Sequence, residues 1–118
     1  MLYMALIYRE EPADFDPQSA EAQKMWEDYG AYTQKIIAAG QFKAGDALMP
    51  STTATCVKKN GHKITTTDGP FAETKEQLGG YYLLDCADLD EAVAAAADIP
   101  HASAGGTIEV RPVIVPGG

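Results

Sequence analysis

The order of the secondary-structure signals constrains this chain most. Residues 2–8 form an apolar run that predicts a buried strand, and a long amphipathic helix follows it. The chain closes with a strand–helix–strand unit over residues 80–87, 89–98 and 106–115, and further strand signals lie between these two parts. This mixed order predicts an α+β fold of ferredoxin-like type. Such a fold has one antiparallel sheet with two helices on one face.

The ends of both helices carry capping signals. Asp16 is the predicted N-cap of the first helix, with Pro17 at the first helical position, where its missing N–H costs nothing. Apolar residues then recur at i, i+3, i+4 and i+7, which predicts one stripe against a core, and Gly40 ends the helix. Asp88 with Glu91 predicts a reciprocal capping box at the start of the second helix.

The middle of the chain predicts a β-hairpin inserted into this fold. Residues 42–48 are a weaker strand candidate, and residues 53–59 and 62–67 flank Asn60-Gly61. Asn-Gly supplies the two positive-φ positions of a type I′ turn.

The two helices cover only one face of the predicted sheet. Strand alternation places a mixed set of side chains on the other face, namely Tyr3, Tyr81, Asp85, Glu109 and Arg111. A face with tyrosines, apolar residues and paired charges is too polar for a core and too apolar to stay fully wet. We therefore expect a homodimer built sheet to sheet, with a cleft between the sheets.

Composition limits the class of protein. A length of 118 residues predicts a single domain spanning 1–118, large enough to fold without a disulfide or a metal. The net charge of −8 argues against nucleic acid and against an anionic membrane surface as partners. No signal segment is visible, and Cys56 and Cys86 read as reduced thiols, so a cytoplasmic location is expected. The two Cys and two His show no zinc-site spacing, and we expect neither a metal nor a cofactor.

The tract of residues 68–76 combines a Gly-Pro turn, an aromatic ring and four ionisable side chains. Asp68 has two readings: a general base at the rim of the cleft, or an acceptor of turn N–H groups before Gly69-Pro70. Phe71 either walls a pocket or plugs the end of the core.

Other candidate site residues come from other strands and one loop. Arg111 either anchors a carboxylate or phosphate ligand or pairs with Glu109 in a structural ion pair. Tyr3 and Tyr81 either offer hydroxyls beside it or pack in an interface. His101 has an ordinary pKa near neutrality and is either a proton-transfer group or an exposed loop residue.

Several of these segments together resemble one known family. The segments are residues 3–8, Gly45 with Leu48, residues 53–55, the run DGPFAETKEQLGGYY, residues 89–92 and IEVRPV at 108–113. In this order they resemble the YCII-related proteins, specifically the branch with the Asp-Gly-Pro-Phe motif. The resemblance covers nearly the whole chain.

The resemblance implies a dimeric α/β barrel. In the wider family an acid/base enzyme with a His–Asp pair is suggested, with the His near the start of the first helix; this chain has no His between Pro17 and Gly40. We therefore expect a protein that binds a small polar or carboxylate-bearing molecule and acts, if it is an enzyme, by cofactor-independent acid/base chemistry. The alternative that the resemblance implies is a non-catalytic regulatory module linked to a sigma factor of the extracytoplasmic-function class.

Overall fold

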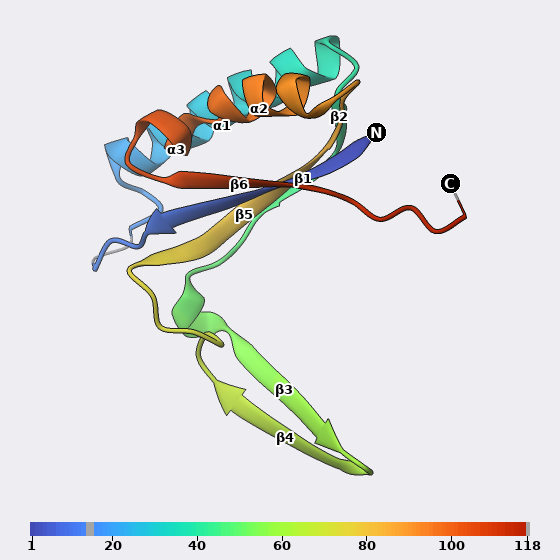
Figure 1. Cartoon of the computed structure of the whole chain (residues 1–118). Coiled ribbons are helices and arrows are strands. Elements are labelled where there is room, and N and C mark those ends of the chain that lie inside the picture. The colour runs from blue at the N-terminus through green and yellow to red at the C-terminus, as the bar shows by residue number, and fades with distance from the viewer. Residues whose placement is uncertain (14–15, 118) are drawn as a thin grey trace.

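The computed structural model describes residues 1–13 and 16–117 and contains the predicted sheet (Figure 1). Its four antiparallel strands lie in the order β2-β5-β1-β6, with the helices on one face. This is an α+β fold with the strand order of ferredoxin-like proteins, as predicted. The elements are β1 (Leu2–Glu10), α1 (Ala20–Ala38), β2 (Phe42–Ala47), the 3-10 turn η1 (Ser51–Thr53), β3 (Thr55–Asn60), β4 (Lys63–Asp68), β5 (Glu76–Asp85), α2 (Leu89–Ala97), α3 (Pro100–Ser103) and β6 (Thr107–Pro112).

The core lies between the sheet and the helices. Central strand β1 sends Tyr3, Ala5 and Ile7 towards the helices, and each of them is buried. Ala5 lies opposite Tyr82 of β5 and Val110 of β6 in the sheet register. Helices α1 and α2 add the buried residues Tyr32, Ile36, Ala92, Ala95 and Ala96, and Tyr82, Leu84, Cys86 and Ile99 complete the core.

The prediction that Tyr3 lies on the helix-free face is wrong. Tyr3 is 3% exposed and lies opposite the fully buried Leu84, so it belongs to the core. Both alternating sets of β1 are apolar, and alternation alone therefore does not tell which set the helices cover. The helix-free face carries Leu2, Met4, Leu6, Tyr81, Leu83, Asp85, Glu109 and Arg111 by register.

Helix α1 begins three residues later than predicted. Its N-cap is Ser19, whose hydroxyl accepts the Ala22 N–H at 3.1 Å, while Asp16 accepts the Gln18 N–H in a preceding turn at 2.9 Å. The predicted end is confirmed: Gly40 has φ of 73°, and the N–H groups of Gly40 and Gln41 bond back to Ile37 and Ile36. These two bonds form a Schellman motif.

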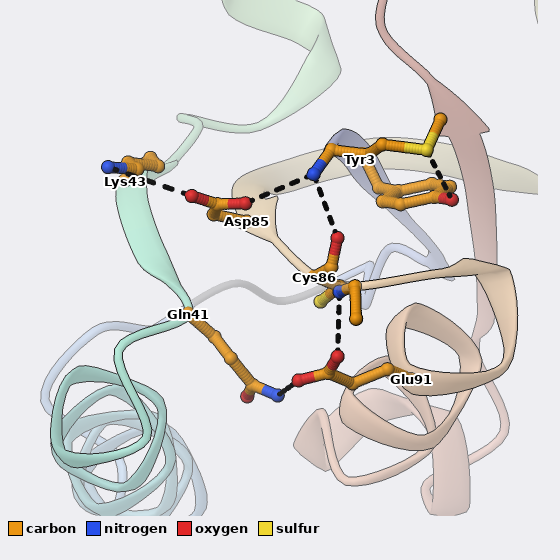
Figure 2. A network of polar contacts seen from close by, with 8 residues as sticks. Tyr3, Gln41, Lys43, Asp85, Cys86 and Glu91 are labelled. Carbon is orange, nitrogen blue, oxygen red and sulfur yellow. Dashed lines mark hydrogen bonds and ion pairs between the residues drawn. The ribbon is translucent and has the colours of Figure 1, made fainter.

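Helix α2 is capped by Asp88, as predicted, but the Glu91 side chain accepts the Ala87 N–H and not the Asp88 N–H that a reciprocal capping box requires (Figure 2). The Glu91 N–H donates to Asp88 at 2.9 Å, and the Glu91 carboxylate accepts the Ala87 N–H and the Gln41 amide. These hydrogen bonds, that of Ala87 first, lower the pKa of Glu91. Next to them the Met1 amino group donates to the Cys86 carbonyl at 2.9 Å and pairs with Asp85.

Strands β3 and β4 form the predicted hairpin, which projects away from the sheet and the helices (Figure 1). The turn differs from the prediction by one residue. Asn60 pairs with Lys63, so the loop is Gly61-His62, and only Gly61 has a positive φ. Positive φ at the first central position alone is the pattern of a type II′ turn. Every residue of β4 is exposed.

Within the described residues, none of the helices is long and apolar enough to cross a membrane.

The two candidate caps of α1 give a direct test of how this helix starts. We expect Ser19→Ala to lower the free energy of unfolding by about 1 kcal/mol, because it removes the acceptor of a helical N–H. Asp16→Ala changes it by less than about 0.5 kcal/mol, since Asp16 lies outside the helix. Urea unfolding of both variants measures this difference. Equal losses would contradict the assignment of Ser19 as the cap.

Candidate functional site

A large hollow lies between α1 and the helix-facing side of the sheet. Its volume is about 610 Å³, and α1, β1, β2, β5 and α3 all contribute to its wall. Its apolar part comes from Ile7, Met25, Trp26, Phe42 and Leu48, and its polar part includes Arg9, Tyr29, Thr33, Tyr82 and His101. We call this hollow the α1 cleft.

Three glycines in the sheet shape the floor of the α1 cleft. A Cβ at Gly45 would lie 2.6 Å from Cδ1 of Tyr82, and a Cβ at Gly80 would lie 2.9 Å from the Asp46 carbonyl oxygen. Strands β2 and β5 therefore tolerate no side chain at these positions. The register of β1 and β5 shifts between Ile7 and Tyr8, opposite Gly79 and Gly80, which is a β-bulge.

His101 and Tyr29 form a hydrogen-bonded pair in the wall of the α1 cleft. The Tyr29 hydroxyl lies 2.6 Å from Nδ1 of His101, and the two rings are 5.5 Å apart between centroids. Burial, and then the Arg9 cation, lower the pKa of His101, while burial raises the pKa of Tyr29 to about 12. At neutral pH the imidazole is therefore uncharged and the phenol protonated. In either tautomer Nδ1 is engaged by Tyr29, and Nε2 has no hydrogen bond from any described residue.

A cluster of tyrosines holds Tyr29 in place. Its ring is stacked on Tyr82 at 6.4 Å with an interplanar angle of 10°. The Tyr82 hydroxyl is 2.7 Å from Thr33 Oγ1, and Tyr32 donates to the Ala95 carbonyl at 2.8 Å. Burial raises the pKa of both Tyr82 and Tyr32, so all three phenols stay protonated at neutral pH. The pair of His101 and Tyr29 is thus built on a fixed aromatic support.

Arg9 brings a positive charge to the same cleft. It follows Ile7 by two residues on β1, so it lies on the helix-facing side, and it is half-buried. Its Nε lies 3.2 Å from the place that a Cβ of Gly79 would take. Its charge acts on both groups: it adds to the lowering of the pKa of His101, and it offsets a small part of the rise that burial causes in the pKa of Tyr29.

Of the predicted site residues, His101 and Tyr81 border the α1 cleft. His101 stands on the short helix α3 rather than in an exposed loop, and it is half-buried. The Tyr81 hydroxyl donates to Asp46 at 2.7 Å, and this bond raises the pKa of Tyr81. By register the Tyr81 side chain lies on the helix-free face, so only its strand contributes to the cleft.

The other predicted site residues lie elsewhere. Arg111 pairs with Glu109 at 3.4 Å on the helix-free face, where the Arg111 side chain is 69% exposed. Asp68 ends β4 in the projecting hairpin and is exposed. Phe71 is 88% exposed, so the reading of Phe71 as a core plug is wrong. The structure therefore does not bring Asp68, Phe71, Arg111, Glu109 and buried Tyr3 to one place.

The tract of residues 68–76 borders a smaller hollow of about 350 Å³. Its wall includes Pro70, Glu73 and Thr74 together with Glu11 and Ser51. Glu11 accepts the N–H and the hydroxyl of Ser51 and so fastens η1 to the end of β1. No group of three or more His, Cys, Asp or Glu residues with metal-site geometry occurs among the residues described. Within the tract, the Gly69 N–H donates to the Ala54 carbonyl at 2.7 Å and the Gly69 carbonyl accepts from Cys56 Sγ at 3.3 Å, so the tract closes the base of the hairpin.

The sequence reasoning missed Arg9 and Tyr29 as site residues. Tyr29 lies in the apolar stripe of α1, where it reads as an ordinary core residue. A signal for Arg9 was present: it continues the alternation of Tyr3, Ala5 and Ile7 on β1.

Comparison with known proteins identifies the family of this chain. The family model of the YCII-related domain matches residues 1–115, so the chain belongs to the YCII-related domain family. An uncharacterized protein of Rhizobium meliloti (strain 1021) is 40% identical over 114 residues, which cover 96% of this chain and 92% of that protein. The resemblance to the YCII-related family is thereby confirmed, and membership of the Asp-Gly-Pro-Phe branch stays a prediction.

The half-buried, neutral state of His101 predicts a specific dependence of stability on pH. Because its pKa in the folded protein is lower than its ordinary value of 6.5, folding favours the neutral ring. The contribution of the neutral His101 ring to the free energy of unfolding is fully present above pH 6.5. It is lost as the pH falls through the pKa of His101 in the folded protein. We expect His101→Gln to flatten the fall of the unfolding free energy between pH 7.5 and pH 5.5, measured by urea unfolding.

The matched control is His62→Gln, at the exposed turn of the hairpin. It should keep the wild-type pH profile. A His101→Gln profile parallel to that of wild type would contradict the neutral, buried state of His101.

Proposed function

We propose that this protein binds a small molecule in the α1 cleft and transfers a proton to or from it through His101, without a cofactor. The observation that carries this proposal is the hydrogen-bonded pair of His101 and Tyr29 in the cleft wall. The proposed function is still the small-molecule acid/base function expected from the sequence. The proposed site, however, lies between α1 and the sheet, and not between two sheets as expected from the sequence.

The size and lining of the α1 cleft suit a small ligand. Ligand pockets commonly span about 300–1,000 Å³ and combine apolar walls with a few placed polar groups. The α1 cleft has about 610 Å³, an apolar side with Trp26 and Phe42, and a polar side with Arg9 and His101.

The pair of His101 and Tyr29 has the properties of a proton-transfer group. A neutral imidazole has one nitrogen that donates and one that accepts, so it serves as acid or base near neutral pH. Tyr29 engages Nδ1 and leaves Nε2 for a ligand. Tyr29 is a positioning residue here, because its own pKa of about 12 keeps its proton in place.

Gly30 gives a way to block the cleft without harming the helix. It lies in α1 at the cleft wall, and a Cβ there would meet nothing within 4 Å. We expect Gly30→Leu to weaken binding of the neutral fluorescent probe N-phenyl-1-naphthylamine by at least about tenfold. The melting temperature should not fall, because leucine favours a helix more than glycine does.

Ala31→Leu is the matched control, since it adds a similar side chain at the next, exposed position of α1, outside the cleft. It should bind the probe like wild type. Energy transfer from Trp26, the single tryptophan and a cleft residue, reports the binding. Equal binding by both variants would place the ligand site elsewhere.

Proton transfer is tested on metabolites that displace the probe. For one that is turned over, we expect His101→Gln to lower kcat by about 10²–10⁴-fold while probe binding stays within about twofold of wild type. Wild-type kcat in this variant would contradict the role of His101.

A second chain is the proposed cover of the helix-free face. Leu2, Met4, Leu6 and Leu83 are only half-buried there, and the helices all lie on the opposite face. Sheet-to-sheet pairing of two copies buries these side chains and gives the dimeric barrel that the family resemblance implies. A sigma-factor partner stays a prediction.

The homodimer predicts a specific change in mass. Met4→Glu places a charge in the centre of the helix-free face, and we expect it to convert a dimer into a monomer in light scattering after gel filtration. Lys24→Glu, on the exposed side of α1, should leave the mass unchanged. A wild-type monomer, or a Met4→Glu dimer, would contradict this assembly.

A further inference from the structure

We propose that the ligand of the α1 cleft is a monoanion with an apolar or aromatic body, whose carboxylate pairs with Arg9. The inference rests on the proposed function of the cleft, and it adds the chemical class of the ligand and the residue that selects it.

Arg9 is the cation available to such a ligand. No carboxylate oxygen of residues 1–13 and 16–117 lies within 4.0 Å of its guanidinium, whereas Lys24, Lys35, Lys43 and Arg111 each have an acidic partner within that distance. Arg9 is half-buried, and a partly desolvated cation gains from a counter-ion. The planar guanidinium suits the two oxygens of a carboxylate, which it binds with two parallel hydrogen bonds.

Glycine at position 79 preserves the place of this guanidinium. A side chain there would have its Cβ 3.2 Å from Nε of Arg9, which is tighter than most Cβ contacts, so the guanidinium would have to move. The bulge between β1 and β5 lies at the same point, so backbone and side chain together leave room for Arg9 in the cleft.

The remaining charges of the cleft favour one negative charge over two. Asp16 and Glu21 also border it, and the whole chain has a net charge of −8. One carboxylate is neutralised by one arginine, whereas the second charge of a phosphate monoester meets these acidic groups. Ile7, Met25, Trp26 and Phe42 in the wall then suit an apolar body.

The anion and the proton-transfer group are coupled through Arg9. The Arg9 charge opposes protonation of His101. An anion on the guanidinium offsets this charge, so a bound monoanion makes His101 a better proton acceptor. Positioning and activation of the ligand thus depend on one residue.

A matched pair of fluorescent probes tests the inference. 1-Anilinonaphthalene-8-sulfonate and N-phenyl-1-naphthylamine share an aromatic body, and the sulfonate of the first stands in for the carboxylate. We expect Arg9→Met to weaken binding of the anionic probe by about tenfold or more and to leave the neutral probe within about twofold. Arg9→Lys, which keeps the charge without the planar fork, should lie between wild type and Arg9→Met.

Lys43→Met, which removes a positive charge outside the cleft, is the control and should bind both probes like wild type. Phenylacetate should displace the neutral probe at a lower concentration than phenyl phosphate. Unchanged binding of the anionic probe to Arg9→Met, or stronger competition by phenyl phosphate, would overturn the inference and leave the cleft function standing. Failure of wild type to bind the neutral probe would instead overturn the proposed function.

Discussion

The position of β1 in the centre of the sheet is the constraint on which the rest of the structure depends. Its hydrogen bonds to β5 and β6 fix which of its side chains face the helices. Tyr3, Ala5 and Ile7 build the core on that side, and Arg9 extends the same row into the α1 cleft. The alternation of side chains along β1 therefore determines both which of its residues enter the core and that Arg9 brings its charge to the candidate site.

The cleft itself exists because the sheet and α1 separate beyond this core. The bulge between Ile7 and Tyr8 and the glycines at 79 and 80 mark that point. Tyr29 and His101 then meet across the opening, although 72 residues separate them in the chain. The tyrosine stack holds one partner, and Pro100 begins the short helix that carries the other. Burial keeps the imidazole neutral, which is the state a proton-transfer group needs near neutral pH.

Local signals in the sequence predicted much of the fold. Gly40 ends α1 and Asp88 caps α2 because these signals act through backbone bonds a few residues away. The start of α1 was wrong because Asp16 and Ser19 are both good caps and Pro17 favoured the first of them. The turn of the hairpin was wrong by one residue, since Asn60 pairs with Lys63 instead of entering the loop.

The site was predicted less well, because its contacts join distant segments. His101 was a candidate, but its partner Tyr29 reads as a core residue, and its helix α3 is only four residues long. The tract of residues 68–76 drew attention through its composition, yet it lies at the base of an exposed hairpin, apart from His101. The resemblance identified the family correctly and did not by itself locate a site.

The proposed ligand site lies between α1 and the sheet. Nuclear magnetic resonance of the isotope-labelled protein, titrated with 1-anilinonaphthalene-8-sulfonate, tests it most directly through the amide signals. We expect the largest shifts at Tyr29, Gly79, Gly80 and His101. Largest shifts at Asp68, Glu109 and Arg111, with the α1 cleft unaffected, would contradict it.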